Sequence, residues 1–292
     1  MPAASGPARR PAVPAGPVAA EALGTALLIA VGCSLVIADF GTGSAVARLL
    51  PSAAARRALT GLLFGTTGAL IALSPIGRWS GAHLNPVVTL AFWLRGRMPG
   101  AVAAAYVGAQ ALGAIAGALP LLLWRSMGRS VLYAATTPGP AGPTLALLGE
   151  AGATAALIAG LFTFLGHRRM RPFTPALFPP LYAILVLVEA PLSGTSTNPA
   201  RSLGPGLVGG TLGSYWLYVA GPLLGTLLVL AVWRLTPALT WRSSTPTPAA
   251  ASGSGGAPHG LRCVVDDPSE DGDPEPQTDK ESPCVPSTFQ RE

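Results

Sequence analysis

The chain has 292 residues, of which 50% are hydrophobic and only 11% are charged, with a formal net charge of +6. A soluble domain usually carries about 25% charged residues, so this composition excludes an ordinary soluble protein. Residues 1–242 hold 16 arginines against four acids, whereas residues 243–292 hold three basic groups against nine acids. The arginines lie mostly between apolar runs, where lipid headgroups would meet them, and give no indication of a nucleic-acid partner.

Six apolar stretches have the roughly 17 to 25 residues that a helix needs to cross a bilayer core. They cover residues 18–38, 57–75, 100–124, 144–166, 175–191 and 213–235. Two further pieces, 84–94 and 197–208, are too short to cross and too apolar for ordinary loops, which predicts re-entrant half-helices. The predicted fold class is an all-α membrane protein with six transmembrane helices and two half-helices.

The two ends of the chain have compositions typical of disorder. Residues 1–17 are rich in Pro, Ala and Gly, and residues 238–292 form an acidic tail with few large apolar side chains. We therefore expect one membrane domain over residues 18–237. With the N-terminus in the cytoplasm, ten of the arginines near the spans lie inside and six outside, so the positive-inside rule predicts that both termini are cytoplasmic.

The chain also contains an internal repeat. Glu21 opens the first span and Glu150 opens the fourth, each followed by a Thr four residues later, and the run YVGAQALG matches YVAGPLLG 112 residues further on. The two repeats cover about residues 18–124 and 144–237. Because each has three spans, the second enters the membrane from the opposite side, and inverted repeats of this kind place a functional site near the bilayer midplane.

Two Asn-Pro pairs, Asn85-Pro86 and Asn198-Pro199, stand 113 residues apart at the starts of the half-helices. Asparagine is a strong N-cap, and proline fits the first helical turn because its missing N–H costs nothing there. In an inverted repeat the two helix starts meet head to head. Their partial positive ends and the two carboxamide groups would offer hydrogen bonds to a neutral solute while repelling cations and protons. This arrangement indicates a pore for uncharged solutes.

With these residues in view, the chain closely resembles the aquaporin and glycerol-facilitator superfamily, the major intrinsic proteins. The resemblance covers about residues 18–237 and rests on six segments in the family's order: AEALGTALLIAVGCS, SGAHLNPVVTLAFW, YVGAQALGAIAGA, LGEAGATAAL, SGTSTNPARSLGP and YVAGPLLG. It implies six tilted helices, two half-helices that complete a seventh pseudo-span, and a homotetramer with one pore in each protomer. It also implies a multi-pass membrane protein that passes water and small neutral solutes. The richness in arginine, alanine and glycine suggests a bacterial origin, and therefore the inner membrane.

The resemblance assigns roles to residues of the two half-helix segments. Asn85 and Asn198 resemble the paired asparagines that bind the permeant molecule. Arg201 resembles the arginine of the selectivity filter, and Thr195 would present its carbonyl or hydroxyl at the same ring. Val87 replaces the usual alanine of the first Asn-Pro-Ala motif and would pack against its partner Ala200, which we expect to cause a small shift.

Two filter positions come from the helices before the half-helices. Val186 matches the fifth-helix position, where water-selective members usually carry histidine, so valine widens the ring. The second-helix position is Phe64 or Gly65, because the segment before Asn85 is one residue longer than the common spacing; we favour Phe64. The segment APLSGTSTNPARSLGP is similar to the plant nodulin-type branch, whose members pass glycerol, urea and metalloid hydroxides, whereas Ser202 argues against a dedicated glycerol channel.

Three further residues can be interpreted either as structural or as functional. His83 is expected to line the cytoplasmic side of the pore, or else simply to pack. Glu21 and Glu150 are carboxylates within spans, where charge is expensive. Their equivalent places favour a scaffolding role that accepts hydrogen bonds from a re-entrant loop, although a proton-coupled transporter that uses them, or Glu189 near the outer end of the fifth span, is an alternative. A strictly water-selective channel and a structural membrane protein with a poor pore are two further alternatives.

No catalytic constellation, metal-ligand cluster or phosphate-binding loop appears in the sequence. We therefore expect neither an enzyme nor a bound cofactor or metal. The predicted partners are the lipid bilayer, the permeating solutes and further copies of the chain.

Overall fold

The computed structural model describes residues 13–235 of the chain, and every regular element in this range is a helix. The predicted acidic tail, residues 238–292, and the first twelve residues lie outside the described range. Helix α1 spans Ala15–Phe40 and so begins inside the segment that the composition predicts to be disordered. Pro17 does not prevent this because it lies in the first turn, where a helix needs no N–H from it. The disorder prediction is therefore wrong for residues 15–17.

The first repeat contains three long helices and one half-helix. These are α1, α3 (Ala53–Leu73), α5 (Pro86–Leu94) and α6 (Gly100–Ala118). Short elements join them: α2 (Ala45–Leu49), α4 (Pro75–Ser80), η1 (Leu119–Trp124), α7 (Arg125–Arg129) and η2 (Leu132–Ala134). Helix α4 lies within the longer segment that precedes Asn85.

The second repeat follows the same order. It contains α8 (Pro143–Gly166), α9 (Thr174–Ser193), α10 (Pro199–Gly209) and α11 (Leu217–Leu235), with the short elements η3 (Arg171–Phe173) and η4 (Leu212–Ser214) between them. Both predicted half-helices are therefore present. They begin two residues later than predicted, because each starts at the proline that follows its capping asparagine.

Five of the predicted spans are long and apolar enough to cross a membrane, judged by length and composition: Ala15–Phe40, Gly100–Arg129, Pro143–Gly166, Arg171–Ser193 and Leu212–Leu235. The sixth, α3, has 21 residues but is less apolar, because it carries Arg56 and Arg57 near its start and three threonines further on. At 1.5 Å per residue it is still about 30 Å long, which matches a bilayer core.

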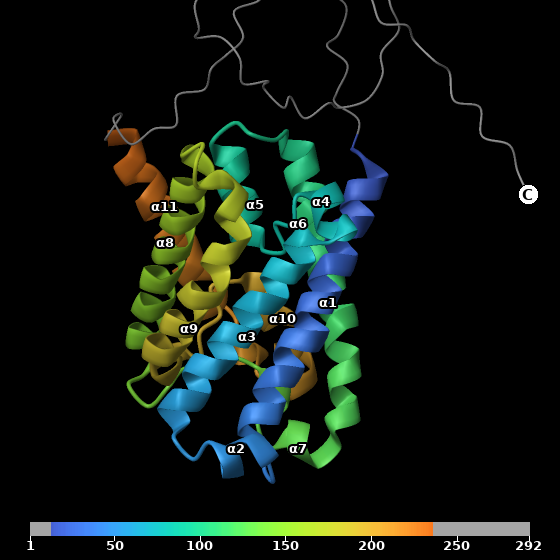
Figure 1. Ribbon diagram of the computed structural model, residues 1–292, viewed down its shortest axis with the longest axis vertical. Coiled ribbons are helices and arrows are strands. Elements are labelled where there is room, and N and C mark those ends of the chain that lie inside the picture. The colour runs from blue at the N-terminus through green and yellow to red at the C-terminus, as the bar shows by residue number, and fades with distance from the viewer. Residues whose placement is uncertain (1–12, 236–292) are drawn as a thin grey trace, which may run out of the picture. The chain divides into compact units, whose positions relative to one another are not determined.

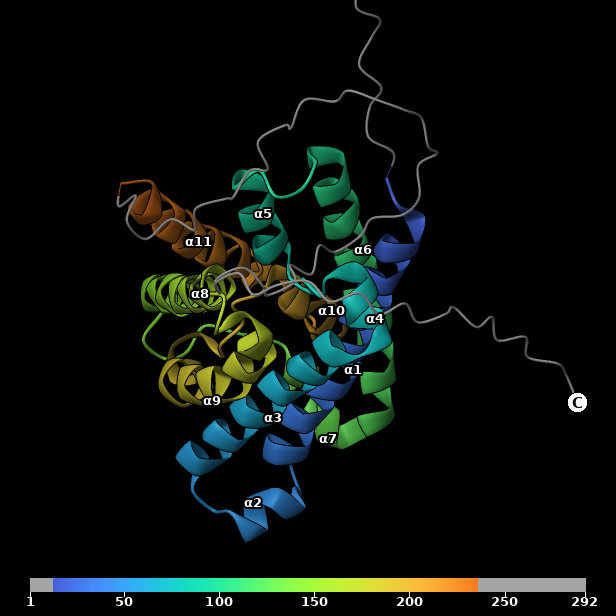
Figure 2. The ribbon, with the colours of Figure 1, turned by 45° about the horizontal axis from the view of Figure 1, so that its top comes forward.

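The helix packing has the pseudo-symmetry of the repeat. The most extensive contacts join α3 to α9, α1 to α6 and α8 to α11. The first pair joins equivalent helices of the two repeats, and the other two pairs are equivalent to each other. Figure 1 shows α5 towards one end of the bundle and α10 further towards the other. Figure 2 shows α1 beside α3 and α8 beside α9. The start of α1 and the end of α11 lie at the same end of the bundle.

Glycines allow two of these helix pairs to approach closely, as small residues commonly do between lipid-embedded helices. A Cβ added at Gly117 of α6 would lie 2.2 Å from the carbonyl oxygen of Ala26 in α1, and one at Gly225 of α11 would lie 2.1 Å from that of Ala151 in α8. Gly108 of α6 makes no such contact. No atom lies within 4 Å of a Cβ added there, because Gly108 is on the exposed side of α6.

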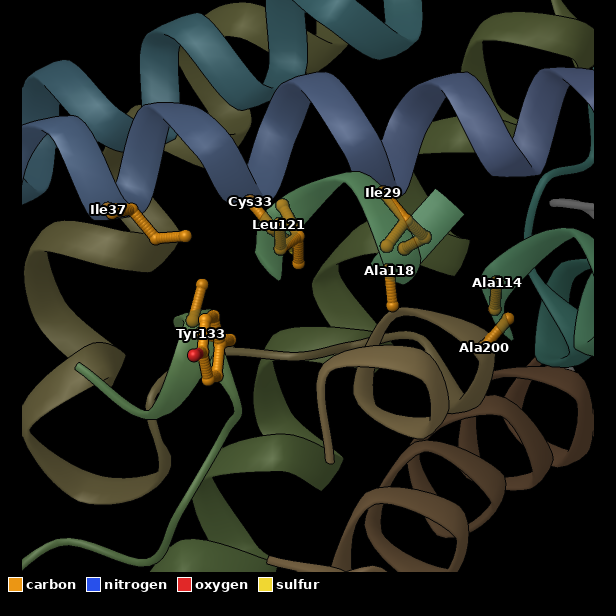
Figure 3. Close-up of a cluster of buried hydrophobic side chains, with 9 residues drawn as sticks. Ile29, Cys33, Ile37, Ala114, Ala118, Leu121, Tyr133 and Ala200 are labelled. Atoms are coloured by element: carbon orange, nitrogen blue, oxygen red, sulfur yellow. The ribbon is translucent and has the colours of Figure 1, made fainter. Parts of the chain in front are cut away.

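A buried apolar cluster fixes the half-helix α10 against the first repeat. Ile29 and Cys33 project from one side of α1 towards Ala118 and Leu121, Ile37 projects from the same side towards Tyr133, and Ala114 lies beside Ala200 of α10 (Figure 3). Gly204 brings α10 still closer, since a Cβ there would lie 2.1 Å from the carbonyl oxygen of Ala114. These contacts hold the start of α10, and with it Asn198, inside the bundle.

Candidate functional site

The two asparagines cap the half-helices that they precede. The side-chain oxygen of Asn85 accepts a hydrogen bond from the backbone N–H of Val87 at 3.0 Å. That of Asn198 accepts from Ala200 at 3.0 Å and from Arg201 at 3.3 Å. The following prolines, Pro86 and Pro199, occupy the first helical position. Both helix starts therefore have the local structure that the sequence predicts.

The same two asparagines also connect the two repeats. The Nδ2 atom of Asn85 donates to the carbonyl oxygen of Thr197 at 2.9 Å, and Nδ2 of Asn198 donates to the carbonyl oxygen of Leu84 at 2.8 Å. Each asparagine thus binds the residue that precedes the other. Because a carboxamide has two N–H groups, each keeps one for a further acceptor. Both side chains line a cavity of about 510 Å³.

The loops before the asparagines have an unusual backbone. Ala82 and Leu84 have φ angles of 48° and 51°, and their equivalents Thr195 and Thr197 have 51° and 54°. A residue with a Cβ pays about 1–2 kcal/mol in this left-handed region, so the surrounding structure must hold the loops in place. Strain that recurs at equivalent positions is typical of a functional segment.

Buried carboxylates supply part of that support. Glu150 accepts hydrogen bonds from the backbone N–H of Ser196 at 2.7 Å and of Thr197 at 2.8 Å. Glu21 accepts from the backbone N–H of Leu84 and, at 2.8 Å, from Nε2 of Gln110. Both carboxylates are fully buried. Each therefore satisfies polar groups of the loop that belongs to its own repeat.

Two equivalent tyrosines support the starts of the same loops. The hydroxyl of Tyr106 in α6 donates to the carbonyl oxygen of Ser80 at 2.7 Å, and that of Tyr218 in α11 donates to the carbonyl oxygen of Ser193 at 2.8 Å. They belong to the matching YVGAQALG and YVAGPLLG segments. The repeat seen in the sequence thus corresponds to a repeated hydrogen bond.

A second cavity, of about 300 Å³, brings together four residues that the sequence predicts to form one ring: Phe64, Val186, Thr195 and Arg201. Arg201 is only 5% exposed, and one of its terminal nitrogens donates to the carbonyl oxygen of Ala134 at 2.7 Å. Its guanidinium carbon lies 5.9 Å from the ring centre of Phe64. The hydroxyl of Thr195 is buried and has no partner among the described residues.

The structure distinguishes between Phe64 and Gly65. Phe64 lines both cavities, whereas Gly65 lines only the larger one. Gly65 also faces α9 so closely that an added Cβ would lie 2.5 Å from the carbonyl oxygen of Phe178. Gly65 is thus a helix-packing position, and Phe64 is the α3 residue beside Arg201.

Of the remaining predicted residues, His83 lines the larger cavity, and Val87 and Ala200 are buried in the protein interior. His83 lines the cavity, its Nδ1 atom lies 3.1 Å from the hydroxyl of Thr89, and its ring stacks on Phe92 with 4.5 Å between ring centres. Val87 and Ala200 are each 1% exposed, so the larger Val87 side chain is accommodated inside the protein.

Within residues 13–235, no group of three or more His, Cys, Asp or Glu is arranged to hold a metal ion.

Tyr182 is a residue of this region that the motifs of the sequence do not indicate. It belongs to α9 and lines both cavities, and its position one helical turn before Val186 could have indicated this. Glu189 lies near the end of α9, where the sequence places it. Its side chain is only 5% exposed and accepts a hydrogen bond from the hydroxyl of Ser193, the last residue of that helix.

The fold and site define a multi-pass helical membrane protein of two inverted repeats, whose half-helices begin side by side in the interior. The chain belongs to the major intrinsic protein family, whose model matches residues 12–233. It is 32% identical to aquaporin NIP1-2 of rice (Oryza sativa subsp. japonica) over 72% of this chain and 67% of that protein. It is 36% identical to aquaporin Z of Rhodopseudomonas palustris over 74% of this chain and 91% of that protein.

A solved structure shares the fold. The X-ray structure of the aquaglyceroporin from Plasmodium falciparum covers 77% of this chain and 98% of its own, with a TM-score of 0.62 and 19% identity. At that identity the likeness concerns the fold alone.

Proposed function

We propose that this protein is a passive channel for water and small uncharged solutes. The observation that carries the proposal is the pair of asparagines, each of which caps a half-helix, binds the loop of the other repeat and keeps one N–H beside the 510 Å³ cavity. Two fixed donors suit a solute oxygen. Membership of the major intrinsic protein family, and the relatives named aquaporins, support the same function.

The proposed path runs from the larger cavity to the smaller one. Phe64, Val186, Thr195 and Arg201 line the smaller cavity and would act as its selectivity filter. Arg201 keeps guanidinium N–H groups beyond the one bound to Ala134, and these can donate to a passing solute. Thr195 lines the same cavity, although its hydroxyl oxygen is buried and is not exposed to it.

The same geometry explains how ions would be excluded. The N-termini of α5 and α10 carry partial positive charge, and both begin at the asparagine pair. Arg201 adds a full positive charge in the smaller cavity. A cation or a proton would meet both fields without a buried carboxylate on the path to balance them, because Glu21 and Glu150 are bound to the loops. This argues against proton coupling through these two residues.

Val186 supports a filter wider than that of a strict water channel. A valine is smaller than histidine and offers no hydrogen bond, so the proposed solutes include molecules of the size of glycerol, urea or a metalloid hydroxide.

The membrane setting is part of the proposal. The bacterial relative aquaporin Z suggests the inner membrane, and the arginine distribution suggests that both termini face the cytoplasm. We further propose a homotetramer, by analogy with the family, with one path in each protomer.

Reconstitution of the full chain in liposomes tests the function. Stopped-flow light scattering should show faster osmotic shrinkage than in empty vesicles, and flux of glycerol or urea down its gradient. A rate equal to that of empty vesicles would refute the channel. Passage of water alone would refute the wide filter, and flux driven by a pH gradient would favour a transporter.

A further inference from the structure

Phe64 and Tyr182 are the two residues that line both cavities. One cavity contains Asn85 and Asn198, and the other contains Val186 and Arg201. The two aromatic side chains therefore stand at the boundary between the asparagine pair and the proposed filter. They come from α3 and α9, the most extensively packed helix pair of the bundle.

The two rings are in contact. Their centres are 5.7 Å apart and their planes are inclined by 43°, which is within the range of paired aromatic side chains. Because carbon atoms in contact already lie about 3.5–4.0 Å apart, the space left between the rings is smaller than a water molecule. A solute must pass beside this pair or displace one ring.

A hydrogen bond holds the Tyr182 ring in this position. Its hydroxyl lies 3.0 Å from the hydroxyl oxygen of Thr197. Thr197 uses its only hydroxyl hydrogen on the carbonyl oxygen of Ser196 at 2.7 Å, so Tyr182 is the donor. Thr197 is itself fixed, since its N–H binds Glu150 and its carbonyl oxygen accepts from Asn85. Tyr182 is thus anchored to the loop that carries the asparagine pair.

This bond also sets what Tyr182 offers to a solute. Since its hydrogen points to Thr197, the phenol oxygen keeps its lone pairs for a passing N–H or O–H group. The free groups of Asn85 and Asn198 are donors. A hydroxylated solute or water molecule would therefore meet donors at the asparagines and an acceptor at the boundary.

We infer that Tyr182, packed against Phe64, forms a separate constriction that limits the size of the permeating solute between the asparagine pair and the Arg201 filter. The inference rests on the proposed channel function and deepens it, because it assigns the size limit to Tyr182 more than to Val186. A path whose filter residue Val186 is small would then still be narrow at Tyr182.

Full-length protein in liposomes provides the test, with water and glycerol permeability measured on the same preparations. Tyr182→Val removes the ring and should raise the ratio of glycerol to water permeability roughly tenfold, which is about 1.4 kcal/mol of barrier. Val186→Ala should raise it less. Val188→Ala, on the same helix at a position that is 66% exposed, is the matched control and should leave the ratio unchanged.

Tyr182→Phe and Tyr182→Leu keep the test informative if the valine variant folds poorly. The phenylalanine ring still fills the boundary, so its ratio should stay within about twofold of the unmodified protein, whereas leucine should raise the ratio several-fold. An unchanged ratio in Tyr182→Val or Tyr182→Leu, with water flux intact, overturns the constriction. A rise in Tyr182→Phe as large as that in Tyr182→Val does so too. An absence of water flux in the unmodified protein would instead refute the channel function.

Discussion

Glu150 and Glu21 occupy equivalent positions in the two repeats, and each accepts a hydrogen bond from the backbone of its own re-entrant loop. Glu150 accepts a backbone N–H at each of its oxygens, from Ser196 at one and from Thr197 at the other. The loops carry left-handed residues just before the asparagines. A carboxylate that offers acceptors on two atoms is well suited to hold several N–H groups of such a strained turn in place.

Replacement of Glu150 by Gln should therefore destabilise the protein. The amide keeps one oxygen but turns an N–H₂ group towards donors, and a buried donor left without a partner costs about 1–3 kcal/mol. We expect a lower melting temperature in detergent and a lower water permeability per folded protein. Solute flux should remain insensitive to a pH gradient, because the role is structural. A variant of normal stability whose flux had become uncoupled from protons would contradict this interpretation.

The fold could be predicted almost completely from the sequence because the signals are strong and local. Apolar length indicates the spans, and Asn-Pro indicates where each half-helix begins. The repeat indicates the inverted order. What the sequence could not provide is the direction of single side chains. The burial of Glu189 against Ser193 and the exposure of Gly108 on α6 are two examples, because neither follows from the residue type.

In the candidate site, too, the sequence indicates some residues and leaves others unpredicted. The two asparagines line one cavity and the four proposed filter residues line the other, whereas Val87 and Ala200 are buried. The functional roles of all these residues remain predictions. The carbonyl oxygen of Ala134 and the hydroxyl of Tyr182 were not found from sequence. Ala134 lies 67 residues before Arg201 in a loop without a motif, and a backbone acceptor leaves no trace in the residue type.

Arg201 provides a test of ion exclusion. Arg201→Val removes the fixed charge from the smaller cavity and the hydrogen bond to Ala134, so protons and small cations should leak. Proteoliposomes loaded with a pH-sensitive dye should report a proton flux above that of the unmodified protein. Arg201→Lys is the control, because it keeps the charge but loses the planar fork of donors. Its leak should stay low, and equal leaks in both variants would argue against an electrostatic barrier.

Val186 provides a test of filter width. Val186→His introduces a larger polar ring into the cavity that Arg201 also lines, so the ratio of glycerol to water permeability should fall roughly tenfold. Val186→Leu adds bulk without polarity and separates the two effects. If the leucine variant matches the histidine variant, size alone sets the filter. A ratio that histidine leaves unchanged would mean that Val186 does not face the permeating solute.

Two glycines of α6 test whether close packing of α1 against α6 stabilises the bundle. Gly117→Ala places a Cβ 2.2 Å from the carbonyl oxygen of Ala26, and the helices must separate to admit it. Overpacking of this kind costs about 1–3 kcal/mol, so the melting temperature in detergent should fall. Gly108→Ala is the matched control, since its Cβ meets nothing within 4 Å and alanine favours the helix by about 0.5–1 kcal/mol. It should melt at the same temperature or higher. Equal losses in the two variants would mean that glycine is needed in α6 for some reason other than the close approach of α1, because only Gly117 of this pair contacts that helix.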